Sequence, residues 1–448
     1  MRNGTRSDFP LPISNFTVSS VYMNPARFLK WFYPGMRVKR WFFAVVGGVL
    51  LFGMGSGLLP VEQGLLLRVI SLALLVSGLF FIVLGVGGIV RSLLEVVVPA
   101  DRQNLVELVF QRRHLEKGPR IVAIGGGTGL STILQGLKQY TTNITAIVTV
   151  ADDGGSSGRL RQEFDMIPPG DIRNCLVALA DTEPLMQRLF QYRFAEDSTL
   201  HGHSFGNLFI TAMTKITGDF EQAVRASSKV LAIRGRVVPS TNTKVRLVAE
   251  HDDGSVTLGE TKISSSPMPI RRIYLEPSGC QPTADALEAI RNANAIVFGP
   301  GSLYTSIIPN LLIDKIVDAI VQSKALKVYI CNVMTQQRET HGYRASDHLR
   351  ALIQHTNPGI VQVCVVNTGK VPSSLLSKYR DEEAFPVEAD ADQIRAMGYQ
   401  VLAEDIVSTE DYVRHDSDQV AKLVIQLIVG TRARPHVPPV PAQKSGHK

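Results

Sequence analysis

Two long apolar runs lie near the start of the chain. Residues 41–59 and 69–90 contain no ionisable side chain. As a helix, each run is long enough to cross a hydrocarbon core of about 30 Å. A cleaved signal peptide would have a shorter apolar region, closer to the start, and no second run directly after it. The pattern therefore predicts a two-helix transmembrane hairpin over residues 41–92.

The charges beside the two runs predict how the hairpin is oriented. Asp8 is the single acid before the first run, and the connection between the runs carries only Glu62 and Arg68. Because cytoplasmic flanks carry the excess of Lys and Arg, both ends are predicted to face the cytoplasm. The expected location is the bacterial cytoplasmic membrane, with the lipid bilayer as a partner and the main domain cytoplasmic. The basic residues just before the first run are Arg27, Lys30, Arg37, Lys39 and Arg40.

The segments around the hairpin are simpler in pattern. Residues 1–40 are expected to form a basic cytoplasmic leader, in which 22–33 is either an interfacial segment or part of a disordered arm. Helical spacing of apolar residues over 101–116, with Gly118 as a stop signal, predicts an amphipathic linker helix within 93–118. Dimerisation through this helix and binding along the bilayer are alternatives. The main domain is predicted over 119–430 and a disordered tail over 431–448.

A strand, a glycine turn and a helix are predicted at the start of the main domain. Residues 120–124 are apolar enough for a buried strand, and apolar residues recur at helical spacing over 130–140. Glycines let a ligand approach the backbone, and the free N–H groups of a helix start attract an anion such as phosphate. The turn matches neither the dinucleotide fingerprint, because Leu130 replaces a small residue, nor a Walker motif, because it has no lysine. The predicted phosphate cradle is Gly125, Gly126, Gly127, Thr128 and Gly129.

The next strand, predicted over 144–150, also runs into a polar segment. Asp152 and Asp153 are candidates to bind ribose hydroxyls or Mg²⁺, and the glycines and serines after them can hold phosphate. A solvated loop is the plain alternative. Because the carboxyl ends of neighbouring parallel strands share one crevice, we expect a functional role. The other candidates here are Ser156, Ser157 and Arg159.

A third glycine-rich segment follows the apolar strand predicted over 295–298. Its Tyr304 is expected either to stack on a base or sugar or to pack in the domain core. The other candidates in this segment are Gly299, Gly301, Ser302 and Thr305.

Several polar residues supply weaker candidates. Asp171 and Ser204 each stand before a helix, where an N-cap role is expected. His201 and His203 have the spacing of a metal pair, but no third ligand is near in sequence, so hydrogen bonding or capping is preferred. Arg414 is expected either to hold a phosphate or to pair with a carboxylate. Asn174, Gly206 and Asn207 are further candidates to line the ligand site.

The alternation of strands and helices predicts the fold class. Further strands over 327–332 and 360–366 continue the pattern and indicate an α/β fold with a Rossmann-like, mostly parallel sheet. β-branched alternation on both sides of 252–254 predicts a hairpin, and with it a small antiparallel β insert over about 229–277.

Composition narrows the possible functions. The chain has 448 residues, a net charge of +7 and four cysteines, which form no CxxC pair. Neither a zinc site nor a disulfide framework is indicated, and a reducing cytosol is the simpler environment. Much of the positive charge lies beside the apolar runs and in the tail, and no nucleic-acid module is recognisable. Nucleic acid is therefore not an expected partner.

Six motifs resemble, in the same order, those of the YvcK-like gluconeogenesis factors, which are relatives of the CofD 2-phospho-L-lactate transferases. The resemblance covers residues 118–430. The motifs are GGGTGLST at 125–132, DDGGSSGRLR at 152–161, PPGDIRN at 168–174, HSFGNL at 203–208, GPGSLYTS at 299–306 and NVMTQQRETHGY at 332–343.

The resemblance implies a Rossmann-like fold that binds UDP-sugars, notably UDP-N-acetylglucosamine. It also implies a role in carbon metabolism, cell-wall precursor supply and cell shape, with Tyr304 and Arg414 in contact with the nucleotide sugar. A cell-wall or amino-sugar pathway protein and a second copy of the chain are the other partners to be expected. Many members of this family are wholly soluble, so the N-terminal hairpin sets this chain apart from them.

Two functions remain open at the level of sequence. The preferred one is a regulatory protein that senses a UDP-sugar and needs no cofactor, because no Ser–His–Asp or activated-cysteine arrangement is visible and no catalytic residue can be assigned. The alternative is a CofD-like transferase, in which Asp152 and Asp153 hold Mg²⁺ against a diphosphate while a phosphate-bearing group moves to an acceptor. Such an enzyme needs room for a deazaflavin, and no lining for one is identifiable.

Overall fold

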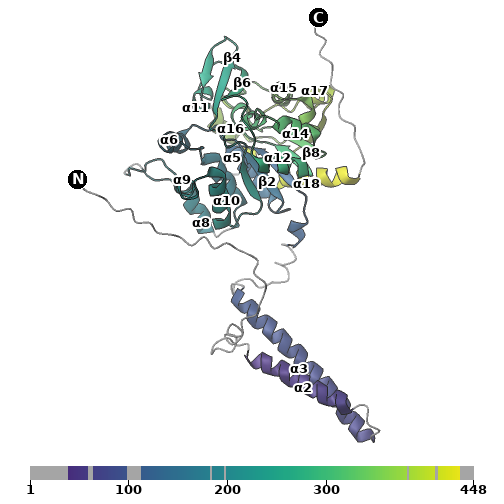
Figure 1. Ribbon diagram of the computed structural model, residues 1–448. Helices are drawn as coiled ribbons and strands as arrows, with labels where there is room; N and C mark the ends of the chain where they lie inside the picture. Colours follow the sequence, from purple (N-terminus) through teal and green to yellow (C-terminus); the bar gives the residue numbers. More distant parts are fainter. Residues whose placement is uncertain are drawn as a thin grey trace, which may run out of the picture. The chain divides into compact units, whose positions relative to one another are not determined.

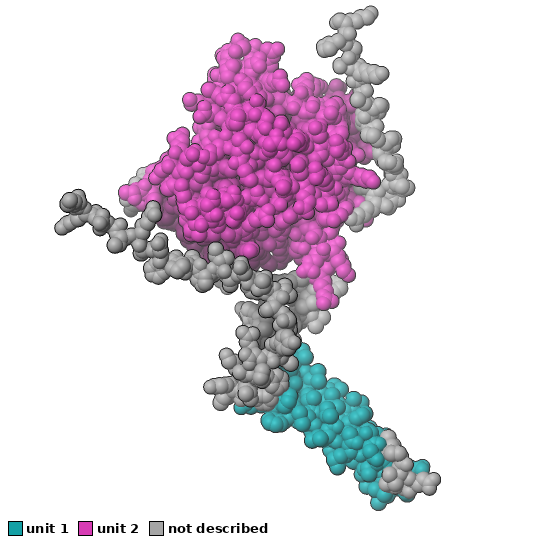
Figure 2. Space-filling model, in the orientation of Figure 1, with its two compact units in different colours: residues 1–109 teal, residues 110–448 magenta. Residues whose placement is uncertain are grey.

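The computed structural model describes residues 39–58, 64–97, 113–181, 184–195, 198–380, 383–408 and 412–433. Figure 1 shows the helices and strands, and Figure 2 shows the two compact units into which the chain divides, residues 1–109 and residues 110–448. The predicted basic leader, the greater part of the predicted linker helix and most of the predicted tail lie outside the described residues.

The first unit contains two apolar helices, α2 (Lys39–Leu58) and α3 (Leu65–Val97), packed side by side. Glycines let their backbones approach closely, because a Cβ at Gly48 or Gly78 would overlap backbone atoms of the other helix. Ser71 on α3 donates its hydroxyl to the carbonyl oxygen of Gly55 on α2, at 2.7 Å. Small residues and interhelical hydrogen bonds are the means by which helices pack in lipid, where apolar contact alone gives no preference.

The outward surface of this hairpin is apolar. Both helices are long and apolar enough to cross a membrane. Phe43 is 64% exposed and Leu50 is 63% exposed, and an apolar surface of this kind is typical of a membrane or partner contact rather than of a surface in water. The predicted pair of helices is confirmed, and α3 extends beyond 69–90 at both ends. Insertion into a bilayer stays a prediction.

The second unit is built on a sheet of seven strands in the order β10-β9-β8-β7-β1-β2-β3. All neighbours in this sheet are parallel, which confirms the predicted Rossmann-like α/β fold. The inner strands consist of buried, mainly β-branched residues, as expected for parallel strands covered on both faces. The strands are β1 (Ile121–Gly125), β2 (Ile144–Val148), β3 (Arg236–Pro239), β7 (Ala295–Phe298), β8 (Leu326–Ile330), β9 (Val363–Asn367) and β10 (Gln400–Glu404).

The direction of the chain across the sheet reverses between β1 and β7. From β1 the chain moves to β2 and β3, whereas from β7 it moves the opposite way to β8, β9 and β10. Because crossovers between parallel strands are right-handed, the two halves place their helices on opposite faces. On one face α5 (Gly127–Leu137) packs against α7 (Gly170–Leu179) and α18 (Ser417–Ala433). On the other, α12 (Ala284–Asn292) packs against α14 (Ile316–Gln322).

The small β insert is an antiparallel sheet of three strands in the order β5-β4-β6 (Figure 1). Strands β4 (Arg246–His251) and β5 (Val256–Leu258) form the hairpin predicted around 252–254, and β6 (Ile270–Glu276) completes the sheet. The insert is shorter than the predicted 229–277, because β3 joins the main sheet beside β2. A short helix, α11 (Glu260–Ile263), lies between β5 and β6.

Candidate functional site

A cavity of about 680 Å³ opens at the carboxyl ends of β1, β7 and β8. Its walls are mainly the segments that directly follow these strands, which is the ligand position expected beside the reversal of strand order. Residues of α7 and α11, Tyr379, Ala384 and the segment before α18 also contribute to the lining. The predicted site residues that line it are Gly126, Gly127, Thr128, Gly129, Gly301, Ser302, Thr305 and Arg414.

The glycine turn after β1 is shorter than predicted, because α5 already begins at Gly127. Gly126 is the N-cap of α5 and has no side chain to cap the helix, and the Asp171 carboxylate accepts the N–H of Gly127 in the first turn. A Cβ on Gly126 would overlap the Asp171 carboxylate, and one on Gly129 would overlap the Pro300 carbonyl group. Glycine at these positions lets Asp171 and the loop after β7 approach the start of α5, where the N–H groups beyond that of Gly127 and the helix dipole favour an anion.

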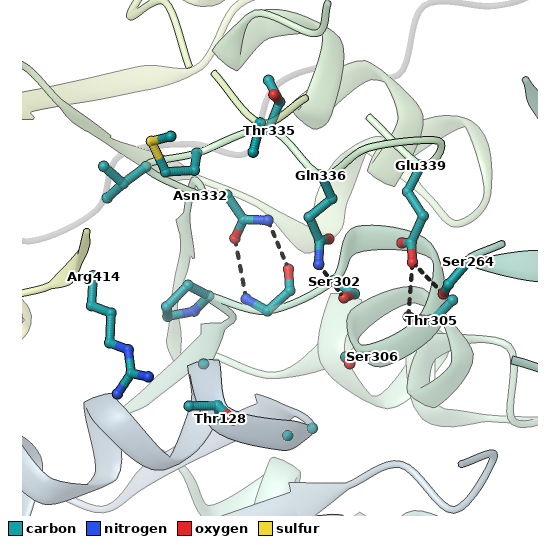
Figure 3. Close-up of a pocket in the computed structure, with 18 of the residues that line it drawn as sticks. Thr128, Ser264, Ser302, Thr305, Ser306, Asn332, Thr335, Gln336, Glu339 and Arg414 are labelled. Atoms are coloured by element: carbon teal, nitrogen blue, oxygen red, sulfur yellow. Dashed lines mark hydrogen bonds between the residues drawn. The ribbon is translucent and has the colours of Figure 1, made fainter. Parts of the chain in front are cut away.

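Asn332, just after β8, fixes the loop that follows β7. Its Oδ1 accepts the N–H of Gly301 at 3.1 Å, and its Nδ2 donates to the carbonyl oxygen of Gly301 at 2.9 Å (Figure 3). Gly299 has φ +71° and Gly301 has φ +153°, values that residues with a Cβ rarely adopt. After them the glycine-rich segment winds into a π-helical turn, η2 (Leu303–Ile307).

Two polar side chains from the segment after β8 line the cavity beside η2. Glu339 is 6% exposed, and its Oε1 accepts from Ser264 Oγ at 2.8 Å and from Thr305 Oγ1 at 3.4 Å. Gln336 donates from Nε2 to Ser302 Oγ at 2.7 Å. Burial raises the pKa of Glu339, and the hydroxyl donors of Ser264 and Thr305 act against that rise.

Three carboxyl groups meet beside the start of α5. Asp171 accepts the N–H of Gly127, and burial followed by the charge of Asp152 raises the pKa of Asp171 to about 7. Burial followed by the charge of Asp152 raises the pKa of Glu260 to about 9, and Glu260 shares a hydrogen bond with Asp152. The predicted N-cap role of Asp171 is wrong, because Pro169 occupies the N-cap of α7. Close, half-buried carboxyl groups of this kind hold protons that isolated ones would release.

Asp153 belongs to a different set of contacts. Its Oδ1 accepts from the backbone N–H of Thr261 at 2.9 Å and from the Thr261 hydroxyl at 2.8 Å. Asp153 thus ties the main domain to the insert, whereas Asp152 lies with Asp171 and Glu260. Within the described ranges, no group of three or more His, Cys, Asp or Glu is arranged to hold a metal ion.

Arg414 reaches the cavity from β12 (Arg414–His415). Its guanidinium lies 5.2 Å from the ring centroid of Tyr412 and forms an ion pair with no carboxylate in the described part of the chain. Of the two roles predicted for Arg414, this arrangement favours phosphate binding. Figure 3 shows Arg414 and Thr128 at the same end of the cavity, away from Glu339.

The segment that carries Arg414 is held by its neighbours. The hydroxyl of Tyr379, in α16 (Ser373–Arg380), accepts the N–H of Val413 at 2.9 Å, and Tyr379 itself lines the cavity. His415 is buried, and its Nε2 donates to the carbonyl oxygen of Cys331 at 3.0 Å. Burial lowers the pKa of His415 to about 4, so this imidazole is neutral at physiological pH.

The polar residues after β2 form a buried cluster away from the cavity lining. The segment 151–161 is not a loop, because α6 (Gly155–Phe164) starts inside it and buries Ser156. The hydroxyl of Ser156 bonds to His203 Nδ1 and to Asn207 Nδ2, each at 3.1 Å. Ser204 caps α9 (Phe205–Thr217) as predicted, and the predicted hydrogen-bonding role of His203 is confirmed. The predicted site residues that the structure does not bring into the lining are Gly125, Asp152, Asp153, Ser156, Ser157, Arg159, Asn174, Gly206, Asn207, Gly299 and Tyr304.

Tyr304 packs in the core of the domain rather than facing the cavity. It is 2% exposed, and its hydroxyl shares a hydrogen bond of 2.8 Å with the hydroxyl of Tyr343. The ring of His355 meets it edge-on, with 5.7 Å between the ring centroids. Of the two roles predicted for Tyr304, the structure shows the core role, and Tyr379 is the tyrosine that lines the cavity.

Many residues of the lining were not among the predicted site residues, and four of them, Gln336, Glu339, Glu260 and Tyr379, carry polar groups discussed above. Gln336 and Glu339 follow β8 as the glycine turn follows β1, so the rule about strand ends could have identified them. Glu260 comes from the insert and Tyr379 from α16, and only tertiary packing brings these two to the cavity.

The chain is similar to known proteins of two kinds, some that match only its larger part and some that match most of its length. A protein-family model described as 2-phospho-L-lactate transferase CofD matches residues 121–407. The gluconeogenesis factor of Bacillus subtilis (strain 168) is 50% identical over 311 residues, which cover 69% of this chain and 98% of that protein. A Nostoc protein that carries the gluconeogenesis-factor name is 45% identical over 421 residues, which cover 89% of this chain and 92% of that protein. The Nostoc alignment covers more of this chain than residues 110–448 contain, so it extends into the hairpin unit.

A solved structure shares the fold of the larger unit. The crystal structure of a UPF0052-family protein from Bacillus halodurans matches with a TM-score of 0.67 and 49% sequence identity. The match covers 69% of this chain and 99% of the Bacillus halodurans chain. The family model spans more than half of this chain, and the Bacillus subtilis relative is matched over nearly its whole length. The chain therefore belongs to the CofD family, in its gluconeogenesis-factor (YvcK-like) group.

Proposed function

We propose that the domain binds a nucleotide sugar of the UDP-N-acetylglucosamine type and acts as a regulatory protein. One observation supports the proposal: the cavity has a guanidinium and a helix start at one end and hydroxyl, amide and carboxylate groups at the other (Figure 3). The N–H groups at the start of α5 and the guanidinium of Arg414 suit a diphosphate, because helix N–H groups and arginine both bind phosphate oxygens. Hydroxyl, amide and carboxylate groups at the Glu339 end suit a sugar. A volume of about 680 Å³ is in the usual range for a small-molecule site.

Regulation is preferred over catalysis because the described lining offers no activated nucleophile. All four cysteines are buried, and burial raises the pKa of Cys331, which follows β8, to about 12. The neutral His415 uses its Nε2 to bond the Cys331 carbonyl oxygen. Such a sensor would link nucleotide-sugar supply to carbon metabolism and to cell-wall precursor supply, and through them to cell shape. Its proposed protein partner is a component of a cell-wall or amino-sugar pathway.

A CofD-like transferase remains the second candidate, favoured by the carboxyl groups beside the start of α5. In that case Asp152 and Asp171 would be the carboxylates that hold Mg²⁺ near a bound diphosphate, rather than Asp152 and Asp153, because Asp153 accepts from Thr261. The metal would supply charge neutralisation during transfer of a phosphate-bearing group. Turnover that requires Mg²⁺ and is lost in Asp152→Asn would favour this function over sensing.

We further propose that the hairpin anchors the domain to the bacterial cytoplasmic membrane. The apolar outward surface of α2 and α3 and their close glycine packing support this location. A reporter fused after Arg91 should be active only on the cytoplasmic side. Activity of that fusion on the outer side would contradict the proposed orientation.

Binding can be tested with the full chain in detergent micelles. UDP-N-acetylglucosamine should raise the Tm of the domain and give a saturable calorimetric signal. Arg414→Ala should weaken binding by about 10- to 100-fold, the range expected when a charge-assisted phosphate contact is lost. Arg395→Ala is the matched control, because Arg395 pairs with Asp392 on the surface. Absence of both heat and thermal shift with every UDP-sugar would rule out the sensing function.

A further inference from the structure

Two buried polar atoms without a partner lie in the wall of the cavity. They are Oε2 of Glu339 and Oε1 of Gln336, both in the segment after β8. Nearly all buried polar atoms in proteins are hydrogen-bonded, because an unpaired one loses its water without compensation. Each of these two atoms therefore lacks a donor among the residues that the structure describes.

The two side chains are held firmly in place. The other oxygen of Glu339 accepts from Ser264 and Thr305, and Gln336 is anchored through its Nε2 to Ser302. Figure 3 shows these contacts together at the end of the cavity away from Arg414. Fixed acceptors of this kind can recognise a ligand without first being ordered by it.

The backbone between these two residues is strained. Arg338 has φ +70°, which is uncommon for a residue with a side chain. Its guanidinium donates to the carbonyl oxygen of Ser265, in the segment after α11. Strained backbone persists where the surroundings hold it, and such positions concentrate at ligand sites. The strain thus falls in the same short stretch as the two unpaired acceptors.

We propose that Glu339 and Gln336 form an acceptor pair that selects a neutral, hydroxyl-bearing sugar and disfavours a sugar that carries a carboxylate. The proposal rests on the nucleotide-sugar function proposed above. With the diphosphate at Arg414 and the start of α5, the sugar lies toward Glu339, where its hydroxyls donate to the two unpaired oxygens. The hydroxyls of Ser264 and Thr305 donate to Glu339 Oε1, and these donors favour the ionised carboxylate against the burial that raises its pKa. A second carboxylate beside it would meet like charge next to a buried carboxyl group.

The test measures binding of UDP, UDP-glucose and UDP-glucuronate to the full chain in detergent micelles by calorimetry. In the unmodified protein, UDP-glucose should bind at least tenfold more tightly than UDP and than UDP-glucuronate. Glu339→Gln keeps the size of the side chain but replaces the unpaired acceptor by a donor. In this variant the advantage of UDP-glucose over both other ligands should fall to about threefold or less, while the affinity for UDP stays unchanged.

Controls separate the possible outcomes. Glu383→Gln removes an exposed carboxylate that accepts from Gln337, and it should preserve the tenfold preference. If Glu339→Gln does not fold, Gln336→Met carries the test, since it removes the second acceptor at similar volume. A folded variant that keeps the full preference for UDP-glucose would overturn the acceptor pair while leaving nucleotide binding intact. Failure of all three ligands to bind the unmodified protein would instead overturn the proposed function.

Discussion

Asn332 and Gly301 exchange two hydrogen bonds, at 3.1 and 2.9 Å, across the carboxyl ends of β8 and β7. Asn332→Ala removes both and leaves half-buried backbone groups of Gly301 without that partner. We expect a loss of about 1–3 kcal/mol in the free energy of unfolding and weaker binding of UDP-N-acetylglucosamine, because the loop after β7 forms one wall of the cavity. Chemical denaturation and calorimetry measure the two effects. An Asn332→Ala protein with unchanged affinity would show that this loop does not shape the ligand site.

Tyr379 and Tyr304 are expected to respond differently to loss of the hydroxyl. Tyr379→Phe loses the bond to the Val413 N–H, which positions the segment before Arg414, so binding should weaken by a few-fold. Tyr304→Phe loses only its bond to Tyr343 in the core. It should lower the free energy of unfolding by about 1 kcal/mol and leave affinity unchanged. Calorimetry together with thermal unfolding of both variants checks the contrast, and the reverse pattern would mean that Tyr304 contacts the ligand.

Glu260 should make the folded state less stable at high pH. Its folded pKa of about 9 and that of Asp171, about 7, lie above the ordinary carboxyl value of about 4. At a pH between the ordinary carboxyl pKa and these folded pKa values, the folded protein binds more protons than the unfolded chain. The free energy of unfolding therefore falls as the pH rises from 5 toward 9. Glu260→Gln should flatten this decline and gain on the order of 1–3 kcal/mol at pH 9, a figure reduced for solvent screening. Thermal melts of both proteins from pH 5 to 9 provide the measurement, and parallel curves would argue against the raised pKa.

The hairpin offers a paired test of close helix packing. A side chain at Gly78 would overlap backbone atoms of α2, whereas Gly47 has nothing within 4 Å of its Cβ position. Gly78→Leu should separate the helices and cost about 1–3 kcal/mol or more, as overpacking does. Gly47→Leu should be nearly neutral. Protease resistance of the hairpin in detergent micelles measures both, and equal resistance of the two variants would show that the helices do not pack through Gly78.

The parts of the site that the sequence predicted are those that follow a strand directly. Gly126, Thr128, Gly301 and Ser302 line the cavity because the carboxyl ends of β1 and β7 are neighbours at the reversal of strand order. The same rule, that segments after parallel strands line one crevice, gave a wrong prediction at β2. There the segment after the strand turns into α6 and buries Ser156 against His203. A strand end indicates only which edge of the sheet a segment reaches; the helix that follows decides which side chains face the cavity.

The glycine turn and the two apolar helices were determined by sequence alone, because both depend on local chemistry. Glycine is needed where the backbone approaches Asp171 and Pro300, and an apolar run of sufficient length forms a helix that lipid can surround. The tertiary structure decided which tyrosine reaches the cavity and which carboxyl groups share protons. Tyr379 and Glu260 lie on α16 and α11, far along the chain from the strands that they meet, and contacts over such separations arise only from packing of the whole domain.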